Sequence, residues 1–305
     1  LFLTIFFISI LLIFLGTGVW VALSMVGVSA IGMLLFTSRP VGDAMATTIW
    51  GTSSSWTLTA LPLFVWMGEI LFRTKLSKNL FKGLAPWMSR LPGGLIHVNV
   101  VGCALFAAIS GSSAATVATV GKMSIPELRK RNYPEKLLLG SLAGSGTLGL
   151  LIPPSIILII YGVTVQESIA KLFIAGIIPG IMLAIFFMLY VIGWSMLNKN
   201  SMPKMDETFS FSQKIKQSGQ LIPVIVLIVA VIGSIYVGIA TATEAASLGV
   251  VGALILSLFQ KSLNKETFKL SLLGATKTSC MIAFILAGSA FLSLAMGFTG
   301  LPRNL

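Results

Sequence analysis

Long apolar stretches alternate along this chain with short polar segments that are rich in lysine and arginine. The stretches at 172–197, 221–237, 245–259 and 275–296 reach, or nearly reach, the roughly 20 apolar residues that cross a hydrocarbon core as a helix. A membrane barrel would instead show ~10-residue strands of alternating polarity. The pattern therefore predicts an all-α, polytopic membrane protein.

The apolar stretch 1–36 is longer than a single crossing requires. As one helix it would extend about 54 Å at 1.5 Å per residue, against a hydrocarbon core of about 30 Å. A Gly-Thr-Gly sequence at 16–18 offers a place to turn. We therefore expect two short crossings hinged at these residues.

Two interruptions break the apolar pattern between residues 95 and 155. The run 95–123 is broken by Ser-Gly-Ser-Ser at 110–113, and the run 134–161 by the glycines at 144–149 ahead of Pro153 and Pro154. In hydrocarbon an unpaired N–H or C=O costs several kcal/mol, so non-helical backbone persists only where it is buried in protein or lines a cavity. Broken helices therefore indicate a binding site and a transport function.

The distribution of positive charge predicts on which side of the membrane the two ends of the first interrupted run, 95–123, lie. Basic residues cluster at 73–90, 122–136, 199–216 and 261–277, and the positive-inside rule places these loops in the cytoplasm. Residues 95–123 are flanked by positive charge on both sides and are too short for two crossings. We predict a re-entrant hairpin there, with half-helices at 95–109 and 114–123.

The second interrupted run is predicted to be a discontinuous spanning helix. A half-helix over 134–145 would unwind at 146–152 and resume from 153 to 161, because Pro153 lacks an N–H and clashes with the preceding turn. Three further segments, 41–56, 76–88 and 264–277, mix apolar and polar residues at near-helical spacing and are interpreted as interfacial arms. The recurrence of an arm before a span favours two related halves.

Composition agrees with a membrane protein and excludes several other classes. Apolar residues make up 56% of the chain and charged residues 10%, with a mean hydropathy of +0.97. The net charge of +12 is explained by cytoplasmic loops rather than by nucleic-acid binding. Cys103 and Cys280 both lie in apolar segments, so no disulfide is expected.

Three motifs occur in order along the chain. They are Ser-Gly-Ser-Ser-Ala-Ala-Thr-Val from 110, Leu-Gly-Leu-Leu-Ile-Pro-Pro-Ser from 148, and Gly-Ile-Ala-Thr-Ala-Thr-Glu-Ala-Ala from 238. With these motifs the chain resembles, over essentially its whole length, the large membrane subunit of the tripartite ATP-independent periplasmic (TRAP) transporters. One departure is Ala242, where the family commonly has proline.

This resemblance implies an elevator-type, inverted-repeat transporter of the bacterial inner (cytoplasmic) membrane that is coupled to sodium and is not an enzyme. The implied partners are a small membrane subunit, a periplasmic substrate-binding protein, the lipid bilayer, and a carboxylate substrate such as sialic acid or a C4-dicarboxylate. Na⁺ is the only metal expected, and no organic cofactor is implied. Because family members usually continue through a second hairpin and a second break, we expect the other half of the binding site to lie beyond residue 305.

The two interruptions supply the oxygen atoms that Na⁺ prefers as ligands, from serine and threonine hydroxyls and from unwound backbone carbonyls. The candidate sodium-binding residues are Ser110, Ser112, Ser113, Gly144, Gly146, Thr147 and Gly149. Small residues also let membrane helices approach closely, so packing is the alternative role for the glycines.

A substrate carboxylate is best held at the N-terminal end of a half-helix, where free N–H groups and the helix dipole favour an anion. The candidate substrate-binding residues are Ser110, Ala114, Pro154 and Ser155. They would act by hydrogen bonds, because no arginine or lysine lies between residues 91 and 121.

Three isolated ionisable residues have structural interpretations that compete with functional ones. Glu69 lies four residues before Arg73, which predicts an ion pair, and Glu244 follows a Thr-Ala-Thr turn, where it would cap a helix. Proton coupling through either glutamate is the alternative. His97 is the only histidine, so a structural hydrogen bond is expected rather than a metal site.

By resemblance, four segments divide the chain. Residues 1–91 and 166–263 would be scaffold helices, with the first arms in 1–91. Residues 92–165 would be half of a moving transport part, and residues 264–305 the start of a second repeat.

Competing functions are an ion-coupled carrier without a binding protein, an intramembrane enzyme, and a structural subunit. No HExxH motif supports the enzyme, and a structural subunit needs no unwound polar segments.

Overall fold

The structure is a computed structural model that describes residues 2–74, 76–203, 210–219 and 221–301. All regular secondary structure in these ranges is helical, which confirms the predicted all-α class. Packing divides the chain into two compact units, Leu1–Leu58 with Lys277–Leu305, and Thr59–Thr276. The four segments predicted from the sequence were defined by which parts move and which begin a second repeat. The two packed units do not test that division, and it stays a prediction.

The first unit contains three helices and the C-terminal part of a fourth. They are α1 (Phe2–Gly16), α2 (Val21–Phe36), α3 (Val41–Ser53) and α14 (Lys265–Phe298). The predicted hinge is confirmed, since α1 ends at Gly16 and Gly18 takes a φ of +82° before α2 begins. Phe7 packs with Val28 in this unit, and Met33 packs with Phe291.

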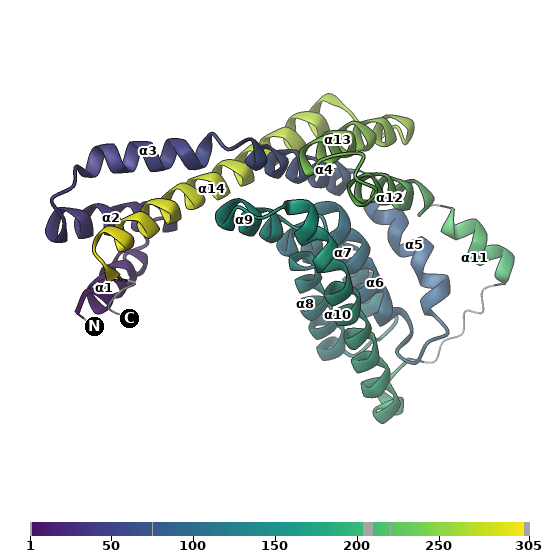
Figure 1. The fold of residues 1–305 in the computed structure, drawn as a ribbon. Helices are drawn as coiled ribbons and strands as arrows, with labels where there is room; N and C mark the ends of the chain where they lie inside the picture. Colours follow the sequence, from purple (N-terminus) through teal and green to yellow (C-terminus); the bar gives the residue numbers. More distant parts are fainter. Residues whose placement is uncertain (1, 75, 204–209, 220, 302–305) are drawn as a thin grey trace. The chain divides into compact units, whose positions relative to one another are not determined.

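The second unit contains the two interrupted segments (Figure 1). Its helices are α4 (Ala60–Arg73), α5 (Leu76–Met88), α6 (His97–Ser110), α7 (Ser113–Lys130), α8 (Glu135–Gly146), α9 (Ile156–Val165), α10 (Ile169–Leu197), α11 (Phe211–Ser218), α12 (Ile222–Tyr236), α13 (Ala242–Phe259) and the start of α14. The described residues also form four 3₁₀ turns: η1 (Trp56–Thr59), η2 (Gly94–Ile96), η3 (Thr147–Leu150) and η4 (Lys199–Ser201). Helices α6, α7 and α8 contact one another, and α10 packs on α6 and α8.

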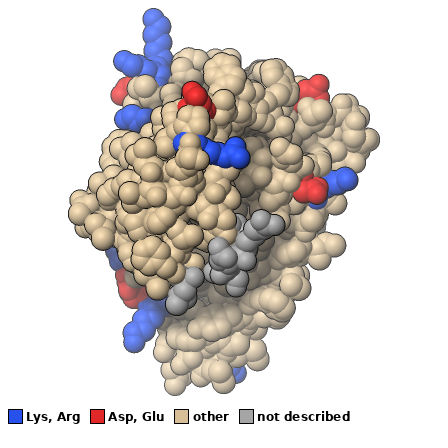
Figure 2. Space-filling model, turned by 60° about the vertical axis from the view of Figure 1, so that its left-hand side comes forward, with Lys and Arg blue, Asp and Glu red and all other residues tan. Residues whose placement is uncertain are grey.

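Several helices of the described ranges have the length and composition of membrane spans. Three of them, α10, α13 and α14, qualify alone, and two bent pairs, α3 with the helix 56–73 and α11 with α12, qualify together. Many apolar side chains on these helices are exposed, as expected where lipid replaces water. Ile178 on α10, for example, is 76% exposed. The face drawn in Figure 2 consists mostly of uncharged residues, with charged side chains in small separate groups.

Two predicted helix ends were wrong. The second hairpin arm was expected to stop at 123 but continues to Lys130, because basic residues end an apolar run without interrupting a helical backbone. The arm 264–277 and the span 275–296 are one continuous helix, α14, since no proline or left-handed residue separates them. The predicted arms at 41–56 and 76–88 are helical as α3 and α5, and their interfacial position stays a prediction.

Candidate functional site

Gly111 and Ser112 form the hairpin turn between α6 and α7. Gly111 ends α6 in the left-handed conformation (φ +59°), and its N–H donates to Ala107 O at 3.0 Å. Ser112 then caps α7, because its hydroxyl accepts from Ala115 N at 3.4 Å and its carbonyl accepts from Thr116 N at 2.9 Å. The predicted break at these residues is confirmed, with α7 beginning at Ser113 rather than at 114.

The interruption of the second segment lies further along the chain than predicted. Residues 147–150 are not unwound but form the 3₁₀ turn η3, and the non-helical stretch is 151–155. The second half-helix, α9, begins at Ile156 rather than at Pro153. Pro153 and Pro154 both lack the N–H that a helix interior uses, so helical hydrogen bonding resumes only after them.

The hairpin tip packs directly on this interruption. Ile156 N, at the start of α9, donates to Gly111 O at 3.2 Å. A Cβ placed on Gly149 would lie 2.9 Å from Ser113 N, and one placed on Gly146 would collide with Val117 Cγ2. The hairpin tip and the interruption are therefore in direct contact.

Neighbouring helices hold this junction through further close approaches. A Cβ on Gly68 of α4 would lie 2.8 Å from Ser110 Cα. On α10, a Cβ on Gly176 would lie 2.6 Å from Leu151 O, and one on Gly180 would lie 2.8 Å from the Ile152 side chain. Packing is thus a demonstrated role of the small residues here, and sodium binding by the predicted glycines stays a prediction.

Most hydroxyl groups of the predicted site already have hydrogen-bond partners. Ser110 Oγ lies 3.0 Å from Thr116 Oγ1, and Ser155 Oγ donates to Leu150 O at 2.7 Å. Ser113 Oγ is different, because it is buried and has no partner among the described residues. Leaving a buried hydroxyl unsatisfied costs about 1–3 kcal/mol, which makes Ser113 the group most open to a ligand.

Two predicted sodium residues lie away from the tip. Gly144 faces α10, since a Cβ there would lie 3.2 Å from the Phe187 ring. Thr147 is exposed and its hydroxyl donates to Gly144 O at 2.7 Å. Of the predicted substrate residues, Pro154 and Ser155 are buried at the interruption, whereas Ala114 is exposed.

A buried polar network between α6 and α8 was missed by the sequence analysis. Asn99 is fully buried, and its amide donates to Ser141 Oγ at 3.0 Å and to Leu138 O at 3.3 Å. Ser145 Oγ reaches Asn99 O at 3.4 Å. An amide inside an apolar run was the available signal, because buried polar groups need partners. The network ties the hairpin to the broken helix.

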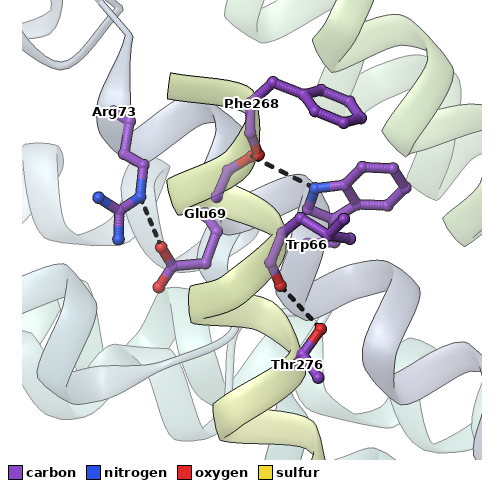
Figure 3. A network of polar contacts seen from close by, with 7 residues as sticks. Trp66, Glu69, Arg73, Phe268 and Thr276 are labelled. Atoms are coloured by element: carbon purple, nitrogen blue, oxygen red, sulfur yellow. Dashed lines mark hydrogen bonds and ion pairs between the residues drawn. The ribbon is translucent and has the colours of Figure 1, made fainter. Parts of the chain in front are cut away.

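The predicted Glu69–Arg73 ion pair is confirmed, with Nε to Oε2 at 3.0 Å (Figure 3). It lies on α4 beside the first turns of α14. There Trp66 Nε1 donates to Ser271 Oγ at 3.3 Å, and the Trp66 ring packs edge-on against Phe268 with centroids 5.8 Å apart. The pair therefore belongs to a helix–helix contact rather than to the hairpin tip.

The other structural interpretations are also confirmed. Glu244 Oε2 accepts from Thr241 N at 2.8 Å and completes a capping box at the start of α13. His97 Nε2 lies 2.8 Å from Pro92 O, and the described residues contain no cluster of three metal-ligating side chains. Cys103 and Cys280 are both free thiols.

The turn between α7 and α8 carries a charge pair outside the candidate spans. The Arg129 guanidinium contacts both carboxylate oxygens of Glu135, with Nε at 3.1 and 3.2 Å. This hydrogen bonding to Arg129 lowers the pKa of Glu135 and raises that of Arg129. Among the described ion pairs it is the one nearest in sequence to the junction.

The fold and this junction define the class of the protein: a helical membrane protein in which a hairpin tip is packed on the interruption of a second helix. A family model described as "Tripartite ATP-independent periplasmic transporter, DctM component" matches residues 7–305. The chain therefore belongs to this family, as a large membrane subunit of the TRAP type.

Relatives named as TRAP permease proteins agree with this assignment. The C4-dicarboxylate TRAP transporter large permease protein DctM of Rhodobacter capsulatus is 30% identical over an alignment of 312 positions that covers 97% of this chain and 70% of that protein. The corresponding protein of Pseudomonas aeruginosa is 31% identical, with 90% and 64% covered. The isethionate TRAP transporter permease protein DctMQ of Oleidesulfovibrio alaskensis is 31% identical, with 96% and 46% covered. The chain thus spans about half to 70% of the length of these relatives.

Proposed function

We propose that this chain forms the large membrane subunit of a sodium-coupled secondary transporter that imports an organic acid. The observation that carries the proposal is the junction of the hairpin tip with the helix interruption, made by Ile156 N and Gly111 O and by the close approach of Gly149 to Ser113. Irregular backbone at membrane depth is typical of substrate and ion sites in secondary transporters. Relatives named for C4-dicarboxylates and isethionate support an organic acid as the substrate class.

The junction fits a sodium ion. Na⁺ prefers oxygen ligands, and the buried Ser113 Oγ has no hydrogen-bond partner in the described chain. Carbonyl groups at the C-terminal end of α6 lack intrahelical donors and supply further oxygens. Ser113 and the backbone of the tip and the interruption are the groups that would hold the ion.

The N-terminus of α7 fits the substrate carboxylate better than that of α9. At α9 the first N–H, on Ile156, is already donated to Gly111 O. At α7 the hydroxyl of the capping Ser112 takes the N–H of Ala115, which leaves the N–H groups of Ser113 and of the exposed Ala114 for an anion. A carboxylate placed there meets free N–H groups and the positive end of the helix dipole.

An elevator movement is proposed for residues 92–161 against a fixed part comprising 1–90 and 171–259. The Asn99 network supports one rigid moving body, because it joins α6 of the hairpin to α8 of the broken helix. Close approaches at Gly176 and Gly180 make α10 the surface along which this body would slide.

The proposed partners are a periplasmic substrate-binding protein and a small membrane subunit, and the proposed location is the bacterial inner membrane. They follow from the family, whose name includes the periplasm, and from the DctMQ relative. The competing proposal is a sodium-coupled carrier that needs no binding protein.

Uptake by the complete transporter in proteoliposomes tests these proposals. Labelled organic acids are offered with an inward Na⁺ or K⁺ gradient, each with and without the binding protein. We expect uptake only with Na⁺ and the binding protein together. Uptake with the K⁺ gradient contradicts sodium coupling, and uptake with Na⁺ alone favours the competing carrier.

A further inference from the structure

Thr116 lies in the first turn of α7, next to the hairpin tip, and it is fully buried. Its hydroxyl Oγ1 lies 3.0 Å from Oγ of Ser110, the last residue of α6. A threonine in a helix can instead bond the carbonyl one turn back on its own helix, as Thr119 does to Ala115 O at 2.7 Å. The Thr116 hydroxyl therefore joins the two half-helices of the hairpin across the turn.

Ser110 Oγ also bonds the backbone of the turn itself. It accepts from Ser112 N at 3.3 Å and donates to Ser112 O at 3.4 Å. A hydroxyl has one proton and two acceptor sites, so it can bond Ser112 and Thr116 at the same time. The backbone N–H of Thr116 donates to Ser112 O at 2.9 Å as well. Thr116 is thus tied to both residues that flank Gly111.

Helix α4 restricts the same serine through its backbone. A Cβ placed on Gly68 would lie 2.8 Å from Ser110 Cα and 3.3 Å from Ser110 O. Helix α4 is itself packed closely on α13, where Gly249 lies against the Met67 side chain. The position of Ser110 is therefore set by two contacts, one with the α4 backbone and one with the Thr116 hydroxyl. The hydroxyl contact is the one that a substitution can remove without changing the packing of the backbone.

We infer that Thr116 is a positioning residue for the proposed sodium site. Through Ser110 it holds the turn that carries the carbonyl groups at the end of α6 and Ser113 Oγ, the buried hydroxyl without a partner among the described residues. Groups that are already held in place lose less conformational freedom when an ion binds, so the Thr116 hydroxyl raises sodium affinity without contacting the ion. The inference rests on the proposed function, because it concerns the same sodium site.

Sodium-dependent uptake by Thr116→Val tests this inference, because valine keeps the branched shape and lacks the hydroxyl. The complete transporter is reconstituted in proteoliposomes with binding protein and substrate in excess, and the half-saturating Na⁺ concentration is measured. We expect this concentration to rise about two- to tenfold, as for the loss of one hydrogen bond, while the uptake rate at saturating Na⁺ stays unchanged. Thr116→Ser keeps the hydroxyl and the Na⁺ dependence of the unmodified transporter. Thr116→Ala gives the same rise as Thr116→Val and guards against misfolding caused by the added methyl group.

Two further comparisons separate positioning from a general effect on stability. Thr119→Val is the matched control, because Thr119 is 3% exposed on the same helix and its hydroxyl bonds Ala115 O of that helix. This variant leaves the half-saturating Na⁺ concentration unchanged. In Ser110→Ala the bond to Thr116 is already lost, so adding Thr116→Val to it has no further effect on this concentration.

The possible results distinguish a failure of this inference from a failure of the proposed function. Sodium-dependent uptake with an unchanged half-saturating concentration in Thr116→Val would overturn the inference and leave the proposed function intact. An equal rise in Thr119→Val, or a further rise when Thr116→Val is added to Ser110→Ala, would also overturn it. Uptake by the unmodified transporter that does not depend on Na⁺ would overturn the proposed function and the inference together.

Discussion

Replacing Gly149 by alanine tests the contact between the hairpin tip and the helix interruption. The new Cβ would lie 2.9 Å from Ser113 N, and 3.1 Å from both Ser112 C and Ser113 Cα. All three are backbone atoms, so no side-chain rotation relieves the overlap. Ordinary contact begins near 3.4 Å, and the tip must therefore retreat by about 0.5 Å, the difference between 3.4 and 2.9 Å.

Overpacking of this kind costs about 1–3 kcal/mol. If sodium binds only when tip and interruption are in contact, the same cost weakens sodium binding by about 5–150-fold, at 1.4 kcal/mol per tenfold change. The assay is the half-saturating Na⁺ concentration for uptake by the complete transporter in proteoliposomes, with binding protein and substrate in excess. We expect this concentration to rise by at least fivefold in Gly149→Ala.

Gly140→Ala is the matched control, because Gly140 lies on α8 and a Cβ there would meet no atom within 4 Å. Alanine in a helix interior is favoured over glycine by roughly 0.5–1 kcal/mol, so this variant keeps its sodium dependence and is slightly more stable. An unchanged sodium dependence in Gly149→Ala, or an equal loss in Gly140→Ala, would refute the reasoning.

Three further predictions concern packing, charge and capping. Gly146→Ala impairs uptake because its Cβ collides with Val117, and Val117→Ala restores uptake in the double variant; an additive loss would contradict this. The lowered pKa of Glu135 means that its pair with Arg129 stabilises the fold above the unfolded pKa of about 4.3 and loses this effect as the pH falls through the lower folded pKa. Melting curves from pH 3 to 6 should therefore show Arg129→Gln less stable than the unmodified protein near pH 6 and equally stable near pH 3. A difference in melting temperature that stays the same across this pH range would contradict the prediction. Thr241→Val removes the cap of α13 and costs about 1 kcal/mol, whereas Thr241→Ser retains the melting temperature; equal melting temperatures for both would contradict the capping role.

The elements that the sequence predicted well are those with a local cause. The hairpin turn follows from a glycine able to adopt positive φ and a serine able to cap, at neighbouring positions in the chain. The Glu69–Arg73 pair and the Thr241–Glu244 capping box likewise depend on spacings of four and three residues. Such features need no knowledge of the tertiary structure.

Features that depend on distant partners were not predictable in the same way. Asn99 finds its partners 39 and 42 residues away, at Leu138 and Ser141, on a helix whose register the sequence does not specify. The exact interruption was misplaced because glycines permit unwinding without requiring it, whereas the two prolines enforce it. The expected separation of arm and span in α14 came from the mixture of apolar and polar residues in 264–277, which resembles that of 76–88, but the helix continues through both segments.

The most direct test of the sodium site is the thermal stability of Ser113→Ala with and without Na⁺. In Na⁺-free buffer, removing the unpartnered hydroxyl leaves the complete transporter equally or more stable, because a buried unsatisfied group is lost. Ser124→Ala is the matched control, since Ser124 Oγ is also buried and unpartnered on α7, further from the tip. We predict that Na⁺ raises the melting temperature of the unmodified transporter and of Ser124→Ala, and no longer does so in Ser113→Ala. A sodium-induced shift of unchanged size in Ser113→Ala would contradict the account.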